Sequence, residues 1–515
     1  MRLAVPFLGA LAALAAWAAQ MVRWLRVLQR EHYEAAALRR FLGRWSAPEV
    51  RPASSKVSGR PVTPSLVLFV VFVITLIAGT LPLAVLASVL YGLTCPWGLT
   101  MKGRTSPLVW TRRLMRVAAT ATVLSALVVV LGAGAQRLWW GVALTIWLVP
   151  LTLDLAARLL TPLENSQAGR FVERARRRLD QVHPRVVAIT GSYGKTSTKN
   201  HLYDLLAPDG AVVATPKSFN NRAGLSRAIN ENLVDGTRVF IAEMGTYGPG
   251  EIAALSSWCV PEVAVITAIG PVHLERMGSL DVIERAKFEI TAGASVVIIN
   301  ADDPRLAQWP TRLSARVVRA GTGDDVDVQL RDDGDEWVLR LAGKSEQRAP
   351  RIVGLNTTNV ACAVAAALEM GVSADEVGAR LRRLRPVDNR AVVARAASGV
   401  TVIDDTFNAN PASALAALNL LADLPVTGRR WVITPGLIEL GAEQYRENAA
   451  LARRVRERGA HLVCVGRTNA RALLAGYGEG AVRVDTRDEA VARVRAELGE
   501  TDAVLYLNDL PDHYP

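Results

Sequence analysis

Cysteine is scarce in this chain of 515 residues, which has four: Cys95, Cys259, Cys362 and Cys464. They stand far apart, with no Cys-x-x-Cys pair and no histidine at ligand spacing, which argues against a disulfide framework and a zinc site. The 39 glycines and 25 prolines show no short repeat and are too few for a fibrous or disordered chain. Aromatic residues make up only 6%, whereas half of the chain is hydrophobic. Because the mean hydropathy of +0.20 is high for a wholly soluble protein, membrane segments are expected.

Acidic residues are scarce in the first 180 residues, which hold 7 of them against 22 lysines and arginines. The remaining 335 residues hold 41 acidic residues against 38 basic ones. All of the basic excess therefore lies in the most apolar third, as expected for loops on the cytoplasmic side of a membrane. A nucleic-acid-binding surface is the competing interpretation, and no nucleic-acid partner is predicted.

Charge is almost absent from five apolar segments, at 5–22, 64–80, 81–97, 117–136 and 138–157. The first has most of its flanking charge after it, unlike a cleaved signal peptide, so a retained span is expected. The basic loops 23–63 and 98–116 belong on the same side, which requires a hairpin turning near Pro82. Each arm has about 17 residues, close to the lower limit for spanning, so a re-entrant hairpin is the alternative. The pattern predicts a multi-pass protein of the cytoplasmic membrane whose partner is the lipid bilayer.

A phosphate-binding loop begins where a buried strand, 185–190, runs into Gly191-Ser192-Tyr193-Gly194-Lys195-Thr196-Ser197 and a following helical stretch. In such a turn, backbone N–H groups and a helix N-terminus face the phosphates. The lysine reaches the β- and γ-phosphates, and the hydroxyl binds Mg²⁺. The strand, turn and helix therefore predict nucleotide binding by these residues.

Further motifs follow in order along the chain. Glu243 ends an apolar strand, and His273 follows another, so both side chains are expected at the carboxyl edge of a parallel sheet, where ligands bind. Asp281 and Glu284 have the spacing of a helix start, which places Lys287 on the second turn. Taken with the phosphate loop, Glu243 and His273 favour a ligand site over solvated side chains.

The shortened loop and these motifs resemble the Mur ligase family and its MurF-like branch, over about residues 183–508. The loop Thr215–Asn221 is similar to the family's substrate-facing segment, and Asn300–Asp303 to its adenine-side turn. Asn356-x-x-Asn359 and Arg390 match helix and hinge positions, and Asp404–Pro411 resembles the start of its third domain.

The resemblance implies a reaction and roles. ATP and Mg²⁺ would activate a carboxylate as an acyl phosphate, which an amine then attacks. Catalysis would fall to Lys195, Glu243, His273, Lys287 and Arg390. Nucleotide binding would involve Gly191, Ser192, Gly194, Lys195, Thr196, Ser197, Asn300, Arg390 and Asp405. Metal would be held by Thr196, Glu243, His273 and carbamylated Lys287, and substrate by Asn220, Asn221, Asn408 and Asn410.

The expected fold is an α-helical membrane domain followed by α/β domains. The boundaries are a membrane domain at 1–165, a basic linker helix at 166–182, a parallel-sheet ATP-binding domain at 183–388 and a smaller doubly wound domain at 389–515. The expected function is a membrane-anchored, ATP-dependent amide ligase that joins a carboxylate to an amino acid or dipeptide in cell-wall or related polymer synthesis.

Departures from the family limit what the resemblance implies about substrates. A membrane domain stands where the family has a soluble domain that grips the UDP-sugar, and Leu355 and Asn389 replace a histidine and a glycine. Segment 434–441 lacks the branch's Gly-Asp opening, and segment 508–515 lacks its Lys-Gly-Ser ending. The acceptor is therefore expected to be a lipid-linked or nascent-polymer carboxylate at the inner leaflet, such as a lipid-linked muramyl peptide. The alternatives are a poly-γ-glutamate-type capsule ligase, a membrane transport ATPase and a scaffold with a degenerate ligase domain.

Overall fold

The N-terminal region is a bundle of helices. The computed structural model of the protein describes residues 4–34, 37–46, 64–96, 99–103, 107–344, 346–352, 354–385, 392–406, 409–510 and 514. The bundle consists of α1 (Ala4–Arg30), α2 (Ala37–Ser46), α3 (Pro64–Ile77), α4 (Leu81–Thr94), α5 (Arg112–Gly134) and α6 (Leu138–Val182). Helices α3 and α4 form a hairpin, and its turn lies where the sequence predicts one.

Three described helices are long and apolar enough to cross a membrane, over Leu8–Arg30, Arg112–Gly134 and Leu138–Val182. Helices α3 and α4 have 14 residues each. At 1.5 Å per residue each is about 21 Å long, shorter than a hydrocarbon core of about 30 Å. Whether the hairpin spans or re-enters stays a prediction.

Helix α6 differs from the two helices expected at 138–157 and 166–182. It is one continuous helix of 45 residues that contains Pro150 and Pro162. Its last turns pack on α8 (Arg222–Asn232), and Ala175 and Leu179 are buried in the core of the central domain. The apolar side of the segment predicted as a linker helix thus contributes to the core of that domain.

The central domain is built on a nine-stranded sheet in the order β2-β3-β1-β4-β5-β6-β7-β8-β9. Pairing is parallel from β2 to β7 and antiparallel from β7 to β9. The expected parallel sheet is thus extended by a hairpin that turns at Gly334, which has φ 61°. The strands are β1 (Arg185–Thr190), β2 (Val212–Ala214), β3 (Val239–Glu243), β4 (Val263–Ile266), β5 (Val296–Asn300), β6 (Arg316–Gly321), β7 (Val328–Asp333), β8 (Glu336–Leu341) and β9 (Gln347–Pro350).

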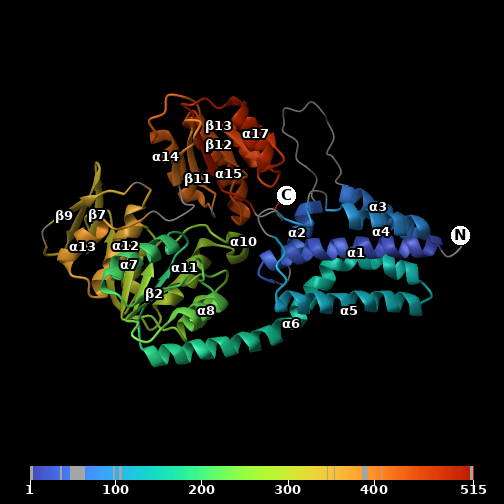
Figure 1. Cartoon of the computed structure of the whole chain (residues 1–515), viewed down its shortest axis with the longest axis horizontal. Coiled ribbons are helices and arrows are strands. Elements are labelled where there is room, and N and C mark those ends of the chain that lie inside the picture. Colours follow the sequence, from blue (N-terminus) through green and yellow to red (C-terminus); the bar gives the residue numbers. More distant parts are fainter. Residues whose placement is uncertain are drawn as a thin grey trace.

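Helices cover both faces of this sheet (Figure 1). One face packs on α7 (Lys195–Leu206), α12 (Thr357–Glu369) and α13 (Ala374–Leu381). The other face packs on α6, α8 and α9 (Glu251–Ser256). Short helices complete the domain: α10 (Leu274–Met277), α11 (Leu280–Phe288), η1 (Ala207–Asp209), η2 (Glu289–Thr291) and η3 (Leu306–Arg312). Burial on both faces explains why the parallel strands are continuous apolar runs.

The C-terminal domain has a six-stranded sheet in the order β10-β11-β15-β12-β13-β14, parallel except for β10. Helices α14, α15 and α16 pack on one face and α17 on the other. Its elements are β10 (Val392–Arg395), β11 (Thr401–Asp405), α14 (Pro411–Asp423), β12 (Arg430–Thr434), η4 (Gly441–Glu443), α15 (Gln444–Glu457), β13 (His461–Val465), α16 (Ala470–Tyr477), β14 (Val482–Val484), α17 (Arg487–Glu497) and β15 (Ala503–Leu507). This is the doubly wound arrangement expected from the alternation of strands and helices.

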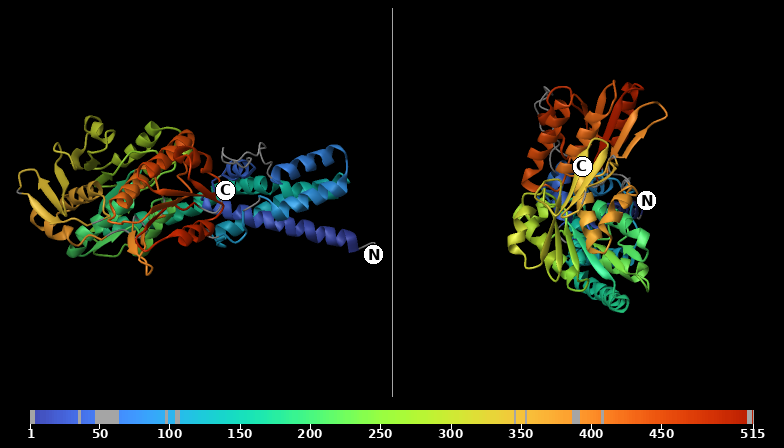
Figure 2. Two further views of the ribbon diagram at one scale, coloured as in Figure 1. Left: turned by 90° about the horizontal axis from the view of Figure 1, so that it is seen from above. Right: turned by 90° about the vertical axis from the view of Figure 1, so that its left-hand side faces the viewer.

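The molecule is elongated, with the helical bundle at one end and the two sheet domains at the other (Figure 2). The inner end of α1 and the C-terminal tail both lie between these parts (Figure 1). Tyr514 packs edge-on against Phe41 of α2, with ring centroids 5.0 Å apart. The C-terminal end thus lies beside the helical bundle, whereas α1 begins at the far end of the bundle (Figure 1).

Candidate active site

The phosphate loop connects β1 to α7 and requires glycine at two positions. Gly191 has φ 151° and Gly194 has φ 80°. A Cβ on Gly191 would lie 2.0 Å from the Thr267 hydroxyl, and one on Gly194 would lie 2.3 Å from the Asn359 amide oxygen. The Lys195 ammonium donates to the Gly191 carbonyl at 2.7 Å, which holds it over the loop. The turn, the lysine and the N-terminus of α7 form the predicted phosphate cradle.

Glu243 lies at the carboxyl end of β3, next to the last residues of β1. Its side chain is 1% exposed and accepts hydrogen bonds from the Thr196 hydroxyl at 2.9 Å and the Asn220 amide at 3.0 Å. A carboxylate and a hydroxyl beside a phosphate cradle are the oxygen ligands that Mg²⁺ prefers. These two residues therefore fit the predicted metal site, although the described residues contain no group of three His, Cys, Asp or Glu side chains placed to hold a metal ion.

Lys199 is a site residue that the sequence analysis missed. Its ammonium lies 3.3 Å from the Glu243 carboxylate and also donates to the Lys217 carbonyl. Burial lowers the pKa of Lys199, and the charge of Glu243 opposes that shift. The spacing of the two lysines could have indicated this role, because Lys199 follows Lys195 by one helical turn and so lies on the same face of α7.

His273 connects the central and C-terminal domains. It precedes α10 with φ 52°, and its Nδ1 atom contacts the Glu439 carboxylate from the loop after β12. The backbone N–H of Glu275 donates to the Glu439 carbonyl at 3.3 Å, so the two loops also meet through their backbones. The Tyr247 ring lies edge-on to His273, with centroids 4.6 Å apart. The sequence alone indicates no role for Glu439, which lies in the segment 434–441 that departs from the family's pattern.

Lys287 is buried near the end of α11, with 2% of its surface exposed. Burial, and to a lesser extent the nearby charge of Lys195, hold the pKa of Lys287 well below its ordinary value. A lowered pKa increases the fraction of the amine that is uncharged. This direction fits the carbamylation implied by the family resemblance, because CO₂ reacts with the uncharged amine.

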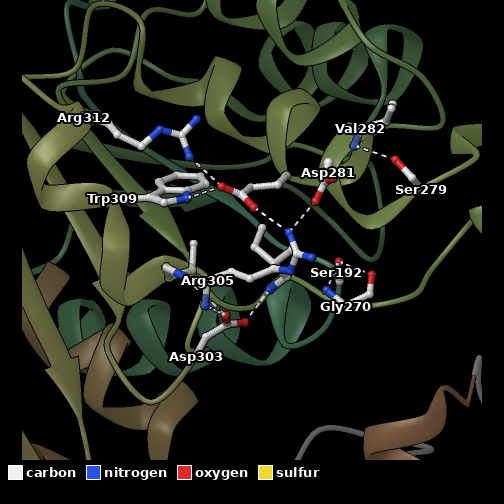
Figure 3. Close-up of polar contacts among 12 residues, drawn as sticks. Ser192, Gly270, Ser279, Asp281, Val282, Asp303, Arg305, Trp309 and Arg312 are labelled. Carbon is white, nitrogen blue, oxygen red and sulfur yellow. Dashed lines mark hydrogen bonds and ion pairs between the residues drawn. The ribbon is translucent and has the colours of Figure 1, made fainter.

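The start of α11 differs from the prediction. Its cap is Ser279, whose hydroxyl accepts from the backbone N–H of Val282 at 3.3 Å (Figure 3). Asp281 and Glu284 instead bind Arg305, at 2.8 and 2.9 Å. A cap must precede the helix, and Asp281 already lies within its first turn. Lys287 consequently lies in the last turn and not in the second.

Asn300 supports the edge of the sheet and does not line the cleft described below. Its amide donates to the Thr267 carbonyl at 2.8 Å and accepts from the backbone N–H of Asp302. Asp303, also visible in Figure 3, accepts from the backbone N–H groups of Ile269 and Arg305. These bonds orient the loops that follow β4 and β5.

The predicted substrate asparagines have different surroundings. Asn220 binds Glu243, whereas Asn221 and Asn410 use their side-chain oxygens to cap α8 and α14. Asp405 is buried at the end of β11. Arg390 and Asn408 lie outside the described residues.

A cleft of 460 Å³ brings most of these residues together. The predicted site residues that line it are Ser192, Gly194, Lys195, Thr196, Asn220, Asn221, Glu243, His273, Lys287 and Asn410. Gly191, Ser197, Asn300 and Asp405 are not among its lining residues. The C-terminal domain adds Glu439 and Asn508, and the end of α1 adds Arg30, Glu31 and His32. The cleft is suited to transferring a phosphoryl group, because it combines a phosphate cradle, a lysine and a carboxylate for Mg²⁺.

Comparison with known families supports this interpretation. Residues 189–367 match the Mur ligase middle domain, and residues 389–507 match the glutamate ligase domain of Mur ligases. The UDP-N-acetylmuramoyl-tripeptide–D-alanyl-D-alanine ligase of Mycobacterium tuberculosis is 36% identical over 62% of this chain and 69% of its own length. The Escherichia coli enzyme of that name is 30% identical over 57% of this chain and 66% of its own length.

Solved structures agree with the sequence comparison. MurF from Acinetobacter baumannii matches with a TM-score of 0.60 and 27% identity, over 66% of this chain and 77% of that structure. MurF ligase from Thermotoga maritima in complex with ADP has the same fold, with a TM-score of 0.59 and 24% identity, over 66% of this chain and 80% of that one. From the cleft and these comparisons together, the chain belongs to the Mur ligase family and is an ATP-dependent, Mg²⁺-using enzyme that forms C–N bonds.

Proposed function

We propose that this enzyme joins D-alanyl-D-alanine to the terminal carboxylate of a muramyl tripeptide in peptidoglycan synthesis. The observation that carries the proposal is the cleft, which combines the phosphate cradle, Glu243, His273 and Lys287. The substrates are those named for the relatives from Mycobacterium tuberculosis and Escherichia coli.

The proposed reaction begins with transfer of the γ-phosphoryl group of ATP to the acceptor carboxylate. The acyl phosphate is then attacked by the dipeptide amine, which loses a proton, and inorganic phosphate leaves as the amide bond forms. Lys195 and the backbone N–H groups of the loop would stabilise the charge of the transferring group. The contact of His273 with Glu439 would hold the two domains closed and keep water from the acyl phosphate.

Thr196 and Glu243 would hold Mg²⁺, which when bound neutralises phosphate charge. His273 and carbamylated Lys287 are the proposed ligands of a second ion. Carbamylation adds CO₂ to the neutral form of the Lys287 amine and releases one proton, which replaces a neutral group by an anion. The burial of this amine and its lowered pKa support this assignment.

The helical bundle is the proposed membrane anchor, in the cytoplasmic membrane, with both sheet domains in the cytoplasm. Large apolar side chains are exposed on its outer surface, including Ile77 at 82% and Val123 at 69%. Continuous exposed apolar surface of this kind marks a membrane or protein contact. We propose that the anchor brings the enzyme to a lipid-linked muramyl acceptor. The boundaries at 165, 182 and 388 remain part of this proposal.

The test is ADP release by the full-length enzyme in lipid nanodiscs. Mg·ATP is supplied with D-alanyl-D-alanine or single amino acids, and with UDP-linked or lipid-linked muramyl tripeptide. We expect ADP release that requires both the dipeptide and an acceptor and is lost in Lys195→Ala. Release that needs no amine would contradict a ligase, and a preference for glutamate would favour the capsule-polymer alternative.

A further inference from the structure

The end of α1 forms one wall of the catalytic cleft. Arg30, Glu31 and His32 line it together with Lys195, Glu243 and His273. The N-terminal region of the chain therefore contributes side chains to the active site besides anchoring it.

Ion pairs fix this wall in place. Arg276 of α10 binds Glu31 at 2.9 Å and Glu34 at 2.8 Å, and its side chain is 16% exposed. Its guanidinium also lies over the Tyr247 ring, 4.8 Å from the centroid. A partly buried arginine that two carboxylates share holds the end of α1 firmly against the central domain.

The rings in the cleft lie in a row from the reaction centre to α1. His273 contacts Tyr247 at 4.6 Å, and Tyr247 contacts His32 at 5.8 Å between centroids. His32 and Tyr33 both have positive φ, 56° and 62°, which terminates α1 and turns His32 toward Tyr247. Two successive non-glycine residues in this conformation are unfavourable and are kept where the surroundings require them. An elongated acceptor can follow this row from its reacting carboxylate toward the bundle.

Two arginines line the α1 end of the cleft, Arg30 and Arg276. Among the acidic side chains of the cleft, Glu31 is paired with Arg276, Glu243 with Lys199 and Asp509 with Arg487. Arg30 is exposed, and among the described residues no hydrogen bond or ion pair engages its guanidinium. Because the carboxylates of Glu31 and Asp509 have arginine partners of their own, the Arg30 guanidinium can attract an anion, and a guanidinium suits phosphate in particular.

We infer that Arg30, with His32 beside it, binds the diphosphate of a diphosphate-linked muramyl acceptor whose carboxylate reacts at Lys195. The inference rests on the proposed function and assigns the acceptor subsite to the end of the membrane helix. Two kinds of acceptor carry such a diphosphate, a UDP-linked one and a polyprenyl-linked one. The position of Arg30, at the end of the apolar helix Leu8–Arg30, favours the polyprenyl source.

The test compares Arg30→Gln with Arg112→Gln in full-length enzyme in nanodiscs. Arg112 is an exposed arginine at the start of α5 that does not line the cleft, so it is the matched control. Three acceptors are used: the UDP-linked muramyl tripeptide, the polyprenyl-diphosphate-linked one and the same tripeptide without diphosphate. Acceptor KM and kcat are measured by ADP release. Binding of each acceptor to ADP-loaded enzyme is measured without turnover.

We expect Arg30→Gln to raise the acceptor KM and Kd about tenfold for the two diphosphate acceptors, the loss typical of one charge-assisted contact. In Arg30→Gln, the KM and Kd for the diphosphate-free acceptor, the kcat and the KM for ATP should change less than about twofold, because these do not depend on the contact. Every constant of Arg112→Gln should also change less than about twofold. A lower KM for the polyprenyl acceptor identifies the membrane source, and a lower KM for the UDP acceptor identifies the nucleotide source.

Equal losses for all three acceptors, no loss, or a loss confined to kcat would overturn the inference. Failure of the proposed function has a different signature. Binding of diphosphate acceptors that depends on Arg30, without ligation of D-alanyl-D-alanine, would keep the subsite and reject the dipeptide ligase.

Discussion

Replacing Lys199 by methionine tests how Glu243, the carboxylate of the proposed metal site, is held. The Lys199 ammonium and the Glu243 carboxylate are 3.3 Å apart, and their side chains are 2% and 1% exposed. Removing one partner of a buried pair costs about 3–5 kcal/mol, because the other charge stays buried and uncompensated. The hydrogen bonds from Thr196 and Asn220 remain in the variant. We therefore expect a loss near the lower end, about 3 kcal/mol.

The assay is native-state hydrogen exchange in peptides that span β1 and β3, with full-length enzyme and no nucleotide. A loss of about 3 kcal/mol accelerates exchange in this sheet by about a hundredfold, since each 1.4 kcal/mol is about tenfold. Adding Glu243→Gln to Lys199→Met should restore most of the protection, because an amide needs no counter-charge. Mg·ADP should also reduce the deficit, because a bound cation replaces the charge of the ammonium.

An acceleration below about fivefold would refute this reasoning, since it corresponds to about 1 kcal/mol, the value of an exposed pair. Equal acceleration in Lys199→Met and the double variant would refute it as well. That result would assign the loss to packing of the lysine chain and not to the stranded carboxylate.

Three further predictions each concern a single side chain. Lys195→Ala should lower ADP release at least about a hundredfold while Mg·ADP still binds, because the ammonium stabilises the transferring phosphate; unchanged release would remove Lys195 from the site. Burial lowers the pKa of His201 to about 4, so the unfolded chain is protonated first as the pH falls. The free energy of unfolding, which is highest above about pH 6.5 in this respect, should therefore decrease by about 1.3 kcal/mol between pH 7.5 and 5.5. Thermal unfolding of His201→Gln should lack this pH-dependent decrease. Arg276→Ala should release the end of α1, seen as faster proteolysis after residue 30. Arg227→Ala, which breaks an exposed pair within α8 and a contact with the Phe219 ring, should not.

The elements that the sequence predicted well are those with strong local signals. The apolar strands before Gly191 and Glu243, the helix after Lys195 and the alternation in the C-terminal domain were all recognisable from short segments. The hairpin of α3 and α4 turns where Gly79 and Pro82 predict it, since Gly79 has φ 69° and Pro82 lies in the first turn of α4. Each of these features depends on backbone preference or on burial of a continuous apolar run.

The sequence by itself determined the phosphate loop and supplied the predicted roles of Lys195 and Glu243, because a glycine turn between strand and helix needs only local residues. Only the tertiary structure decided the partners of those residues. Lys199 acquires its role because β3 lies beside β1, and Glu439 meets His273 because two domains close on each other. Arg30 reaches the cleft because α1 ends there and its neighbours bind Arg276, 246 positions further along the chain than Arg30. Contacts between such distant residues have no local signal, since they arise only when the packing of whole domains fixes their positions.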